Sequence, residues 1–103
     1  MTQMTVLYHT PTDPKHFHEY YYATHVPIAK RVPGLRQYTV SNGAVSAPDG
    51  SPAKYELVAQ LSFDSADALK AAFGSPEGQA AVNDLANFAT GGVTILVFET
   101  REV

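Results

Sequence analysis

The residues of this 103-residue chain best suited to acid–base chemistry are its four histidines and six tyrosines. His25 is the strongest catalytic candidate, because an imidazole with an ordinary pKa of about 6.5 can give or take a proton near neutrality. Pro27 follows closely and should distort a helix there, which frees backbone carbonyls near Ala23. We therefore predict that His25 is a general acid or base beside this distortion. The alternative is a structural histidine that only caps the freed carbonyls.

Four tyrosines are expected to border the same pocket as His25. Tyr38 lies in the middle of an expected strand, where its phenol could orient a carbonyl or phenolic substrate. Tyr22 precedes His25 by one helical turn and is predicted to share its face. Tyr8 and Tyr55 are predicted to be pocket walls, since a phenol with a pKa of about 10 is a weak acid near neutrality. For Tyr22 and Tyr38, simple packing between helix and sheet is the alternative.

Metal, thiol and phosphate chemistry have little support in the sequence. His16 and His18 fall on opposite sides of a helix, and no carboxylate shares the stripe that joins His18 to His25. Zero cysteines exclude thiolate nucleophiles and disulfides. Gly91-Gly92 matches no phosphate-binding pattern. We expect no metal and no cofactor, with heme ligation by His25 as a remote alternative. Asp84 is expected to be a solvated helix residue or a partner for a basic side chain in a dimer, with a catalytic carboxylate as a remote alternative.

Charge and hydropathy limit the partners of the chain. A formal net charge of -3 provides no basic field for a polyanion, so we predict no nucleic-acid binding. No segment approaches the roughly 18 to 20 apolar residues that span a bilayer, and the first residues lack the order of a signal peptide. We therefore predict a cytoplasmic protein that is not bound to a membrane. A single domain of residues 1–103 buries a limited core, which favours an oligomer.

The elements that must position these side chains follow a simple order. Apolar and β-branched runs predict strands at 4–10, 35–45, 55–63 and 93–99. Helical periodicity predicts helices over 15–32, over 66–73 after an N-cap at Ser65, and after a second N-cap at Ser75. This βαββαβ order is typical of an α+β ferredoxin-like fold, in which a four-stranded antiparallel sheet carries both helical segments on one face.

The helical periodicity also predicts which side chains face the sheet. In the first helix the predicted packing stripe contains Phe17, Tyr21, Thr24 and Ile28. A second stripe, predicted to lie beside it, contains His18, Tyr22, His25 and Ala29. In the last helix the predicted apolar stripe contains Val82, Leu85 and Phe88 or Ala89.

The last strand carries apolar side chains on both faces. Val93, Ile95 and Val97 point one way, whereas Leu96 and Phe98 point the other. Because the helices cover only one face of the sheet, a second copy of the sheet is expected to cover the other, which predicts a homodimer. The alternative is a central strand in a monomer whose apolar face is partly exposed.

Two blocks of the sequence resemble the EthD family, which is named for a protein of ethyl tert-butyl ether degradation. The first block contains Leu7-Tyr-His-Thr-Pro11, the aromatic residues Phe17 and Tyr20 to Tyr22, His25-Val-Pro-Ile28 and Pro33-Gly-Leu35. The second contains Phe73-Gly-Ser-Pro-Glu-Gly78, Asn83-Asp84 and Asn87-Phe88. The resemblance implies a dimeric α+β barrel, in which two ferredoxin-like subunits pack sheet against sheet.

The resemblance implies a superfamily rather than one reaction. Its members include muconolactone isomerases, polyketide cyclases and small monooxygenases, and the protein that names the family is regarded as an accessory of a cytochrome P450 system. His25 and Tyr38 resemble in position a histidine and a tyrosine that contribute to the pocket of methylmuconolactone methylisomerase. The lack of cysteine disfavours a thiol-assisted isomerase, and the chain also lacks the tryptophan that cofactor-free monooxygenases of this fold often carry.

We therefore expect a homodimer with one pocket per subunit for an apolar or aromatic, oxygen-bearing metabolite. The expected chemistry is isomerisation, cyclisation or dehydration without a cofactor, with His25 as acid or base and with Tyr38 and Tyr22 orienting the substrate. One alternative is a non-catalytic accessory protein that brings a hydrophobic compound to an oxygenase. Another is a cofactor-independent monooxygenase.

Overall fold

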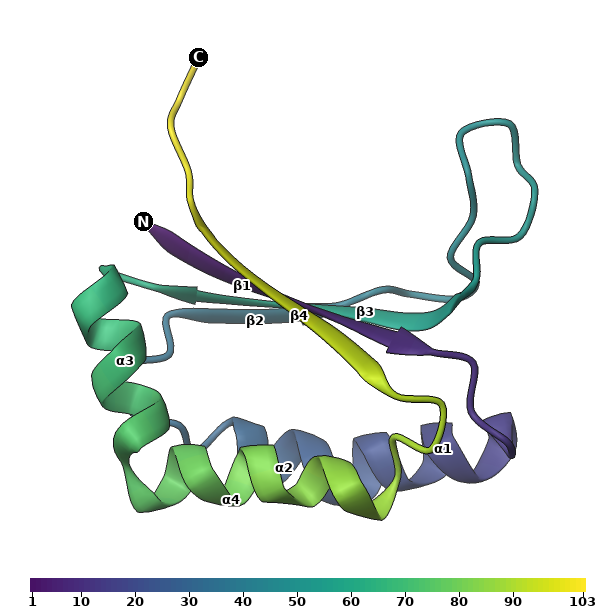
Figure 1. Cartoon of the computed structure of the whole chain (residues 1–103), viewed down its shortest axis with the longest axis horizontal. Coiled ribbons are helices and arrows are strands. Elements are labelled where there is room, and N and C mark those ends of the chain that lie inside the picture. Colours follow the sequence, from purple (N-terminus) through teal and green to yellow (C-terminus); the bar gives the residue numbers. More distant parts are fainter.

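Four strands form an antiparallel sheet, and the helices lie on one face of it (Figure 1). The computed structural model describes all 103 residues. The strands are β1 (Thr2–His9), β2 (Gln37–Val40), β3 (Tyr55–Phe63) and β4 (Val93–Glu99), and their order in the sheet is β2-β3-β1-β4. The predicted α+β ferredoxin-like fold is confirmed.

The helical layer contains α1 (Pro14–Tyr20), the π-helical segment η1 (Tyr21–His25), α2 (Val26–Ala29), α3 (Ala66–Gly74), α4 (Pro76–Asp84) and the short 3-10 helix η2 (Leu85–Asn87). The two predicted N-caps are confirmed: the Ser65 side chain accepts a hydrogen bond from the Ala68 amide, and Ser75 accepts one from the Gly78 amide. None of the helices has the length and apolar content needed to cross a membrane.

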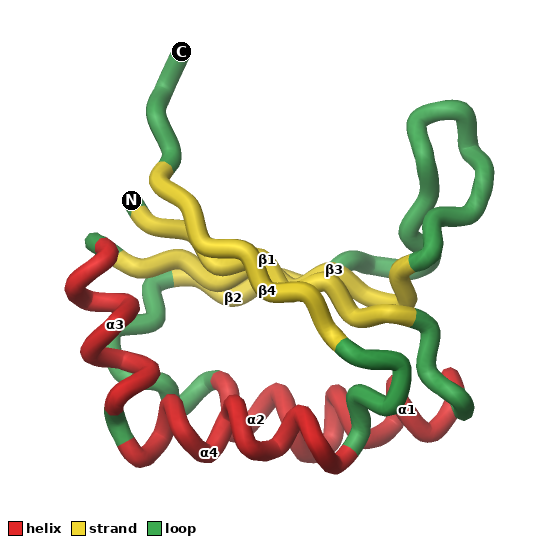
Figure 2. Tube along the Cα trace, viewed as in Figure 1, coloured by secondary structure: helices red, strands yellow, loops and turns green.

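Strand β2 is shorter than the predicted strand at 35–45. The chain leaves the sheet after Val40, and Gly43 adopts a positive φ of 86° that suits a turn. The following residues form a long loop between the end of β2 and the start of β3, which projects away from the side of the sheet that carries the helices (Figure 2). One isolated bridge, between Ser46 and Pro52, closes this loop.

The distortion predicted near Pro27 is present as a π-helix. The Val26 amide bonds to the carbonyl of Tyr21, five residues earlier, and Pro27 has no N–H with which to continue an α-helical ladder. In a regular α-helix, residues four apart differ in direction by about 40° around the helix axis. A π turn contains more residues than an α turn, so residues four apart point in more nearly the same direction.

The π-helix changes the face on which His25 lies. Phe17, Tyr21, His25 and Ala29 are all buried, so these four residues form one stripe against the sheet. The predicted pairing of His25 with His18 and Tyr22 was therefore wrong, because it used α-helical spacing up to His25, whereas Tyr21–His25 is a π-helix.

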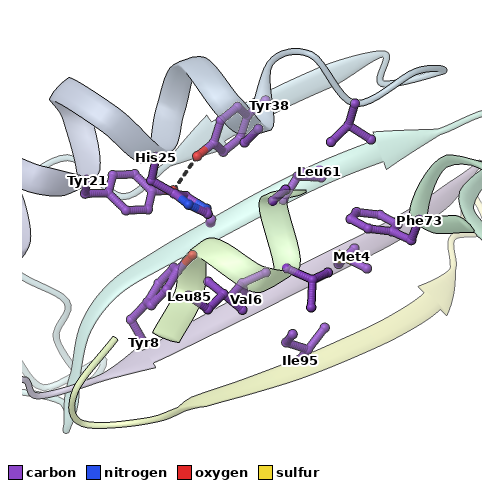
Figure 3. A pocket seen from close by; sticks show the side chains of 15 residues that line it. Met4, Val6, Tyr8, Tyr21, His25, Tyr38, Leu61, Phe73, Leu85 and Ile95 are labelled. Carbon is purple, nitrogen blue, oxygen red and sulfur yellow. Dashed lines mark hydrogen bonds between the residues drawn. The ribbon is translucent and has the colours of Figure 1, made fainter. Parts of the chain in front are cut away.

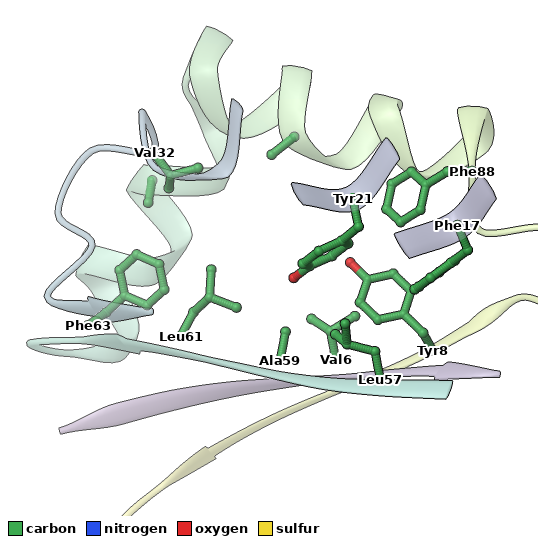
Figure 4. Close-up of a cluster of buried hydrophobic side chains, with 12 residues drawn as sticks. Val6, Tyr8, Phe17, Tyr21, Val32, Leu57, Ala59, Leu61, Phe63 and Phe88 are labelled. Carbon is green, nitrogen blue, oxygen red and sulfur yellow. The ribbon is translucent and has the colours of Figure 1, made fainter. Parts of the chain in front are cut away.

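An aromatic cluster fills the space between the helices and the sheet (Figure 4). The Tyr8 ring lies 5.4 Å from that of Phe17 and 5.5 Å from that of Tyr21, both edge to face, and Phe88 lies 5.7 Å from Tyr21. Such pairs each contribute about 0.5 to 1.5 kcal/mol beyond the burial of their area. The cluster therefore holds Tyr8 and Tyr21 in fixed positions.

Strand β4 lies at an edge of the sheet, so the alternative that it is a central strand was wrong. Ile95 pairs with Val6 on the helix side, whereas Leu96 pairs with Thr5 on the opposite side. Ile95 is 43% exposed and Leu96 is 50% exposed. No helix of this chain covers the face that carries Leu96 and Phe98 (Figure 1).

Candidate functional site

A cavity of about 60 Å³ lies between the helices and the sheet and opens toward the surface. Fourteen of its 15 lining residues are hydrophobic, and no lysine, arginine, aspartate or glutamate is among them. His25, Tyr8, Tyr21 and Tyr38 supply its polar atoms. Figure 3 shows these four side chains gathered toward one side of the cavity, away from Phe73. The site is thus an apolar cavity with one polar end.

His25 is held by a carboxylate that sequence reasoning did not assign to the site. The Nδ1 atom of His25 lies 2.9 Å from Oδ2 of Asp84, and both side chains are only 6% exposed. The other carboxylate oxygen of Asp84 accepts hydrogen bonds from the Tyr20 hydroxyl at 2.6 Å and from the Asn87 amide at 2.9 Å. The expectation that Asp84 is solvated was wrong, and the His25 ring bonds to Asp84 rather than to a freed carbonyl.

The position of Asp84 has a signal in the sequence. Gly78, Ala81, Asp84 and Phe88 are spaced three, three and four residues apart, and all four are buried. The predicted stripe led by Val82 was rotated from this one, and Val82 is in fact exposed. An acidic residue within a stripe of small and aromatic residues therefore marks the buried carboxylate.

Electrostatics set the protonation of this pair. Burial opposes ionisation of Asp84, but hydrogen bonds from Tyr20, Asn87 and His25 outweigh it and lower the pKa of the carboxyl. Burial lowers the pKa of His25, and the hydrogen bond to Asp84 offsets only part of that effect. At neutral pH the imidazole is therefore neutral, and it donates its Nδ1 proton to the carboxylate, which can only accept.

The second imidazole nitrogen of His25 is not held by any hydrogen bond within the chain. Every side-chain nitrogen or oxygen that is fully buried in this structure has a hydrogen-bond partner. Nε2 of His25 has none, so this atom is not fully buried. Because His25 lines the cavity, we infer that the accessible surface of Nε2 lies there. Its lone pair is thus available to a bound molecule, which is the arrangement of a general base oriented by a carboxylate.

Three tyrosine hydroxyls lie at the same end of the cavity. The hydroxyls of Tyr21 and Tyr38 are 2.5 Å apart, and the ring of Tyr8 packs against Tyr21. Burial raises the pKa of Tyr8, Tyr21 and Tyr38, so the three phenols stay protonated. Tyr8 and Tyr38 thus line the same cavity as His25, and their roles toward a substrate stay predictions. The structure adds Tyr21, which the sequence analysis assigned only to packing.

Tyr22 and Tyr55 lie outside this cavity. Tyr22 is 51% exposed and lines a separate surface cleft, in which Nε2 of His18 lies 2.8 Å from Oε2 of Glu56. Tyr55 is displaced by a β-bulge, since the register of β1 and β3 shifts between Tyr8 and His9.

The bulge turns Tyr55 to the other face of the sheet. It moves Glu56 to the helix side, where that residue meets His18. The Tyr55 ring packs instead against His9, whose Nε2 lies 2.9 Å from the Thr94 hydroxyl. The predictions that Tyr22 and Tyr55 border the pocket of His25 were therefore wrong.

No cluster of three or more His, Asp and Glu side chains has the geometry of a metal site.

Solved structures with this fold differ widely in their described activity. SnoaB from Streptomyces nogalater, a cofactor-independent oxygenase, has a TM-score of 0.67 at 19% identity, with 99% of this chain and 94% of that chain covered. A hydroxynitrile lyase from Passiflora edulis has a TM-score of 0.77 at 13% identity and the same coverage. A dimeric ferredoxin-like protein from Thermobifida fusca has a TM-score of 0.71 at 17% identity, with 96% and 90% covered. At these identities the likeness shows the fold alone.

Nearer relatives cover essentially the whole chain. An uncharacterized 11.0 kDa protein in the thcB-thcC intergenic region of Rhodococcus erythropolis is 40% identical over 103 residues, which are 100% of this chain and 98% of that protein. The crystal structure of an ethyl tert-butyl ether degradation family protein from Bacillus halodurans is 31% identical, with a TM-score of 0.88 and with 98% of this chain and 99% of that chain covered. The family profile described as the EthD domain matches residues 9–92. With a matching profile, a matching structure and the predicted fold, this chain belongs to the EthD family.

Proposed function

We propose that this protein is a cofactor-free acid–base enzyme acting on a small apolar or aromatic substrate that carries oxygen. One observation carries the proposal: Asp84 holds a buried, neutral His25 so that Nε2 faces an apolar cavity. A base in such a place needs no metal or organic cofactor to remove a proton.

The arrangement supports a simple proton transfer. Nε2 of His25 takes a proton from a C–H or O–H bond of the substrate, and the electron pair of that bond moves onto the substrate, toward its oxygen. The resulting imidazolium is stabilised by the carboxylate of Asp84. Return of the same proton to another atom gives isomerisation. Attack of the resulting carbanion on a carbonyl of the same substrate, whose oxygen takes the proton back from the imidazolium, gives cyclisation. Loss of a hydroxyl group as water, with the same returned proton, gives dehydration.

The lining of the cavity favours a neutral substrate. A carboxylate or phosphate would be buried without a cationic partner, because no lysine or arginine lines the site. The cavity, at about 60 Å³, is also smaller than the roughly 150 Å³ that accommodates benzene in an enclosed apolar site. The oxygen-bearing end of a ring-sized substrate would enter the cavity, while the remainder occupies the mouth beside the exposed Val82 and Ile95.

The functional unit in this proposal is a homodimer. Leu96 and Phe98 leave an exposed apolar surface on the sheet face that carries no helix. A second copy of the same sheet would cover it in a self-complementary way. The dimeric protein of the same fold from Thermobifida fusca supports this assembly.

Two other functions would use the same cavity. Its apolar lining also suits a carrier that delivers a hydrophobic compound to an oxygenase. The fold shared with a cofactor-independent oxygenase favours direct reaction with molecular oxygen. A carrier gives no reason for a carboxylate-held imidazole, and an oxygenase would itself need a base to ionise its substrate before oxygen reacts, so proton transfer by His25 is the preferred chemistry.

A base-catalysed probe reaction tests the proposal without the natural substrate. 5-Nitrobenzisoxazole is a neutral aromatic compound that opens to a cyanophenolate when a base removes its C–H proton and the N–O bond breaks. The purified chain should accelerate this opening, and His25→Gln should lower kcat/KM by about 100-fold or more. His16→Gln, at an exposed helix position, is the matched control and should retain the wild-type rate.

Two outcomes would overturn the proposal. If wild-type protein binds the probe but opens it no faster than His25→Gln does, the carrier function is supported instead. If the protein consumes oxygen with anthrone and leaves the probe unchanged, the oxygenase function is supported.

A further inference from the structure

We infer that the hydroxyls of Tyr8, Tyr21 and Tyr38 form one binding site for a negatively charged oxygen, the phenolate or enolate oxygen of a ligand that has lost its proton to His25. The inference rests on the proposed function, in which His25 is the base. It goes further by naming the ligand class, which is weak oxygen or carbon acids that are neutral in water and become anionic in the site.

The three hydroxyls come from separate elements and meet at one place. Tyr8 lies on β1, Tyr21 on η1 and Tyr38 on β2. The hydroxyls of Tyr21 and Tyr38 are 2.5 Å apart, and the Tyr8 and Tyr21 rings meet edge to face at 5.5 Å. The ring of His25 lies 5.3 Å from that of Tyr21. Figure 3 shows Tyr8, Tyr21 and Tyr38 directed toward the same space as the imidazole.

The hydroxyls have donors to spare. Three phenols carry three O–H groups, and a chain of hydrogen bonds among three hydroxyls uses at most two of them. At least one O–H therefore remains for a ligand, and two remain when only the bond between Tyr21 and Tyr38 is kept. Such O–H donors stabilise an anionic oxygen more strongly than a neutral one.

Burial keeps these hydroxyls as donors. It raises the pKa of each of the three phenols, so none of them competes with a ligand for the negative charge near neutral pH. The neighbouring charged group is Asp84, which bonds to Nδ1 of His25 and whose charge also raises the pKa of Tyr8. The site thus combines neutral hydrogen-bond donors, the three tyrosine hydroxyls, with a neutral base, the imidazole of His25.

The balance of charge selects the ligand. When His25 takes the ligand's proton, the new imidazolium compensates the new anion within the cavity, so no unpaired charge enters from water. A carboxylic acid has already lost its proton at neutral pH and would enter as a bare anion, which the apolar lining disfavours. Phenols and 1,3-diketones fit, because they can enter neutral and ionise inside.

Binding of 4-nitrophenol tests the inference, because its phenolate absorbs at a longer wavelength than the neutral phenol. Bound to the wild-type protein, it should ionise at a lower pH than it does in water. Tyr38→Phe and Tyr8→Phe should each raise this bound-state pKa by about one unit and weaken phenolate binding by about tenfold, as expected for loss of one hydrogen bond to a charged group. Tyr55→Phe is the matched control on the other face of the sheet and should change neither value.

A second ligand keeps the test independent of how well the variants fold. 4-Nitroanisole has the same ring but no ionisable proton, so wild-type protein should bind it more weakly than 4-nitrophenol, and the phenylalanine variants should bind it as wild type does. The inference is overturned if bound 4-nitrophenol stays neutral, or if Tyr38→Phe and Tyr8→Phe behave as Tyr55→Phe does.

This result is separable from the proposed function. Opening of 5-nitrobenzisoxazole by His25, together with neutral bound 4-nitrophenol, would overturn the oxygen site and leave the base intact. Bound phenolate without opening of that probe would support the oxygen site and count against catalysis.

Discussion

Nδ1 of His25 lies 2.9 Å from Oδ2 of Asp84, although 59 residues separate the two in the chain. Tyr20 and Asn87 hold the second oxygen of the same carboxylate, which fixes its orientation. A carboxylate so placed determines which imidazole nitrogen carries the proton, and hence which one faces the cavity. This contact connects the two helical segments of the fold to the chemistry proposed for it.

Asp84→Asn should weaken His25 as a base. The carboxylate now raises the pKa of His25 against the larger effect of burial, so its removal should lower that pKa further. An amide can also hold the imidazole in the wrong tautomer, as in triads that lose their carboxylate. We expect kcat/KM for 5-nitrobenzisoxazole to fall at least about tenfold and the His25 pKa, measured by NMR, to drop. Asp49→Asn, in an exposed loop, should leave both values unchanged. A rise in the His25 pKa would contradict the assignment.

The pH dependence of the probe reaction should report a depressed histidine pKa. Only neutral His25 can accept a proton, and burial lowers its pKa below the ordinary 6.5. Of the groups that surround it, the tyrosines remain neutral and Asp84 remains charged over this range. The rate should therefore rise with pH to a plateau, with its midpoint below pH 6.5. A midpoint at or above 6.5 would show that another group controls the reaction.

His25 should also make the free energy of unfolding depend on pH. Its pKa is lower in the folded protein than the value of 6.5 expected for the unfolded chain, so between these values the unfolded state binds the proton more tightly. Its full contribution is present above pH 6.5 and is lost as pH falls toward the folded pKa. Urea unfolding at about pH 7.5 and about pH 5.5 should show a larger loss for wild type than for His25→Gln. Equal losses would mean that the folded pKa is not depressed.

Gly78→Ala should destabilise the junction of α3 and α4. A Cβ at Gly78 would lie 2.1 Å from the Ala72 carbonyl oxygen and 2.6 Å from the Phe73 Cα, and these backbone atoms cannot easily move away. We expect a loss of about 1 to 3 kcal/mol, seen as a lower urea midpoint. Gly74→Ala, at the end of α3, has no atom within 4 Å of its added Cβ and should be neutral or slightly stabilising. Equal effects of the two substitutions would contradict the close helix contact.

Leu96→Glu combined with Phe98→Glu should convert the proposed dimer into a monomer. Both side chains are exposed on the uncovered face of the sheet, so glutamates there would place like charges opposite one another between two copies. Light scattering at micromolar concentration should give a dimer for wild type and a monomer for the double variant. Ala80→Glu, on the exposed side of α4, should remain dimeric. A stable wild-type monomer would contradict the sheet-to-sheet assembly.

The order of elements could be predicted from local patterns alone. The Ser65 and Ser75 caps, the alternation within 55–63 and the apolar run at 93–99 depend on residues that are near neighbours in sequence, so their signals are local. The same signals were sufficient to predict the ferredoxin-like fold and the positions of Tyr8 and Tyr38 on strands that face the cavity.

The faces of Tyr22, His25 and Tyr55 could not be predicted in this way. The π-helix at Tyr21–His25 brings His25 onto the stripe of Tyr21, and the β-bulge at the start of β3 turns Tyr55 away from the face that carries Leu57. The pattern near Pro27 indicated a distortion, but a local pattern does not state by how much the helix will turn.

The amino-acid sequence by itself determined the βαββαβ order, the helix caps and the choice of His25 as the candidate base, because these depend on residue type and short spacing. Only the tertiary structure decided that Asp84 holds His25 and that Tyr21 joins Tyr8 and Tyr38. The physical reason is that burial is a property of packing. Asp84 loses its water only where α4 closes over η1, and three phenols from three elements meet only once the sheet and the helices have packed together.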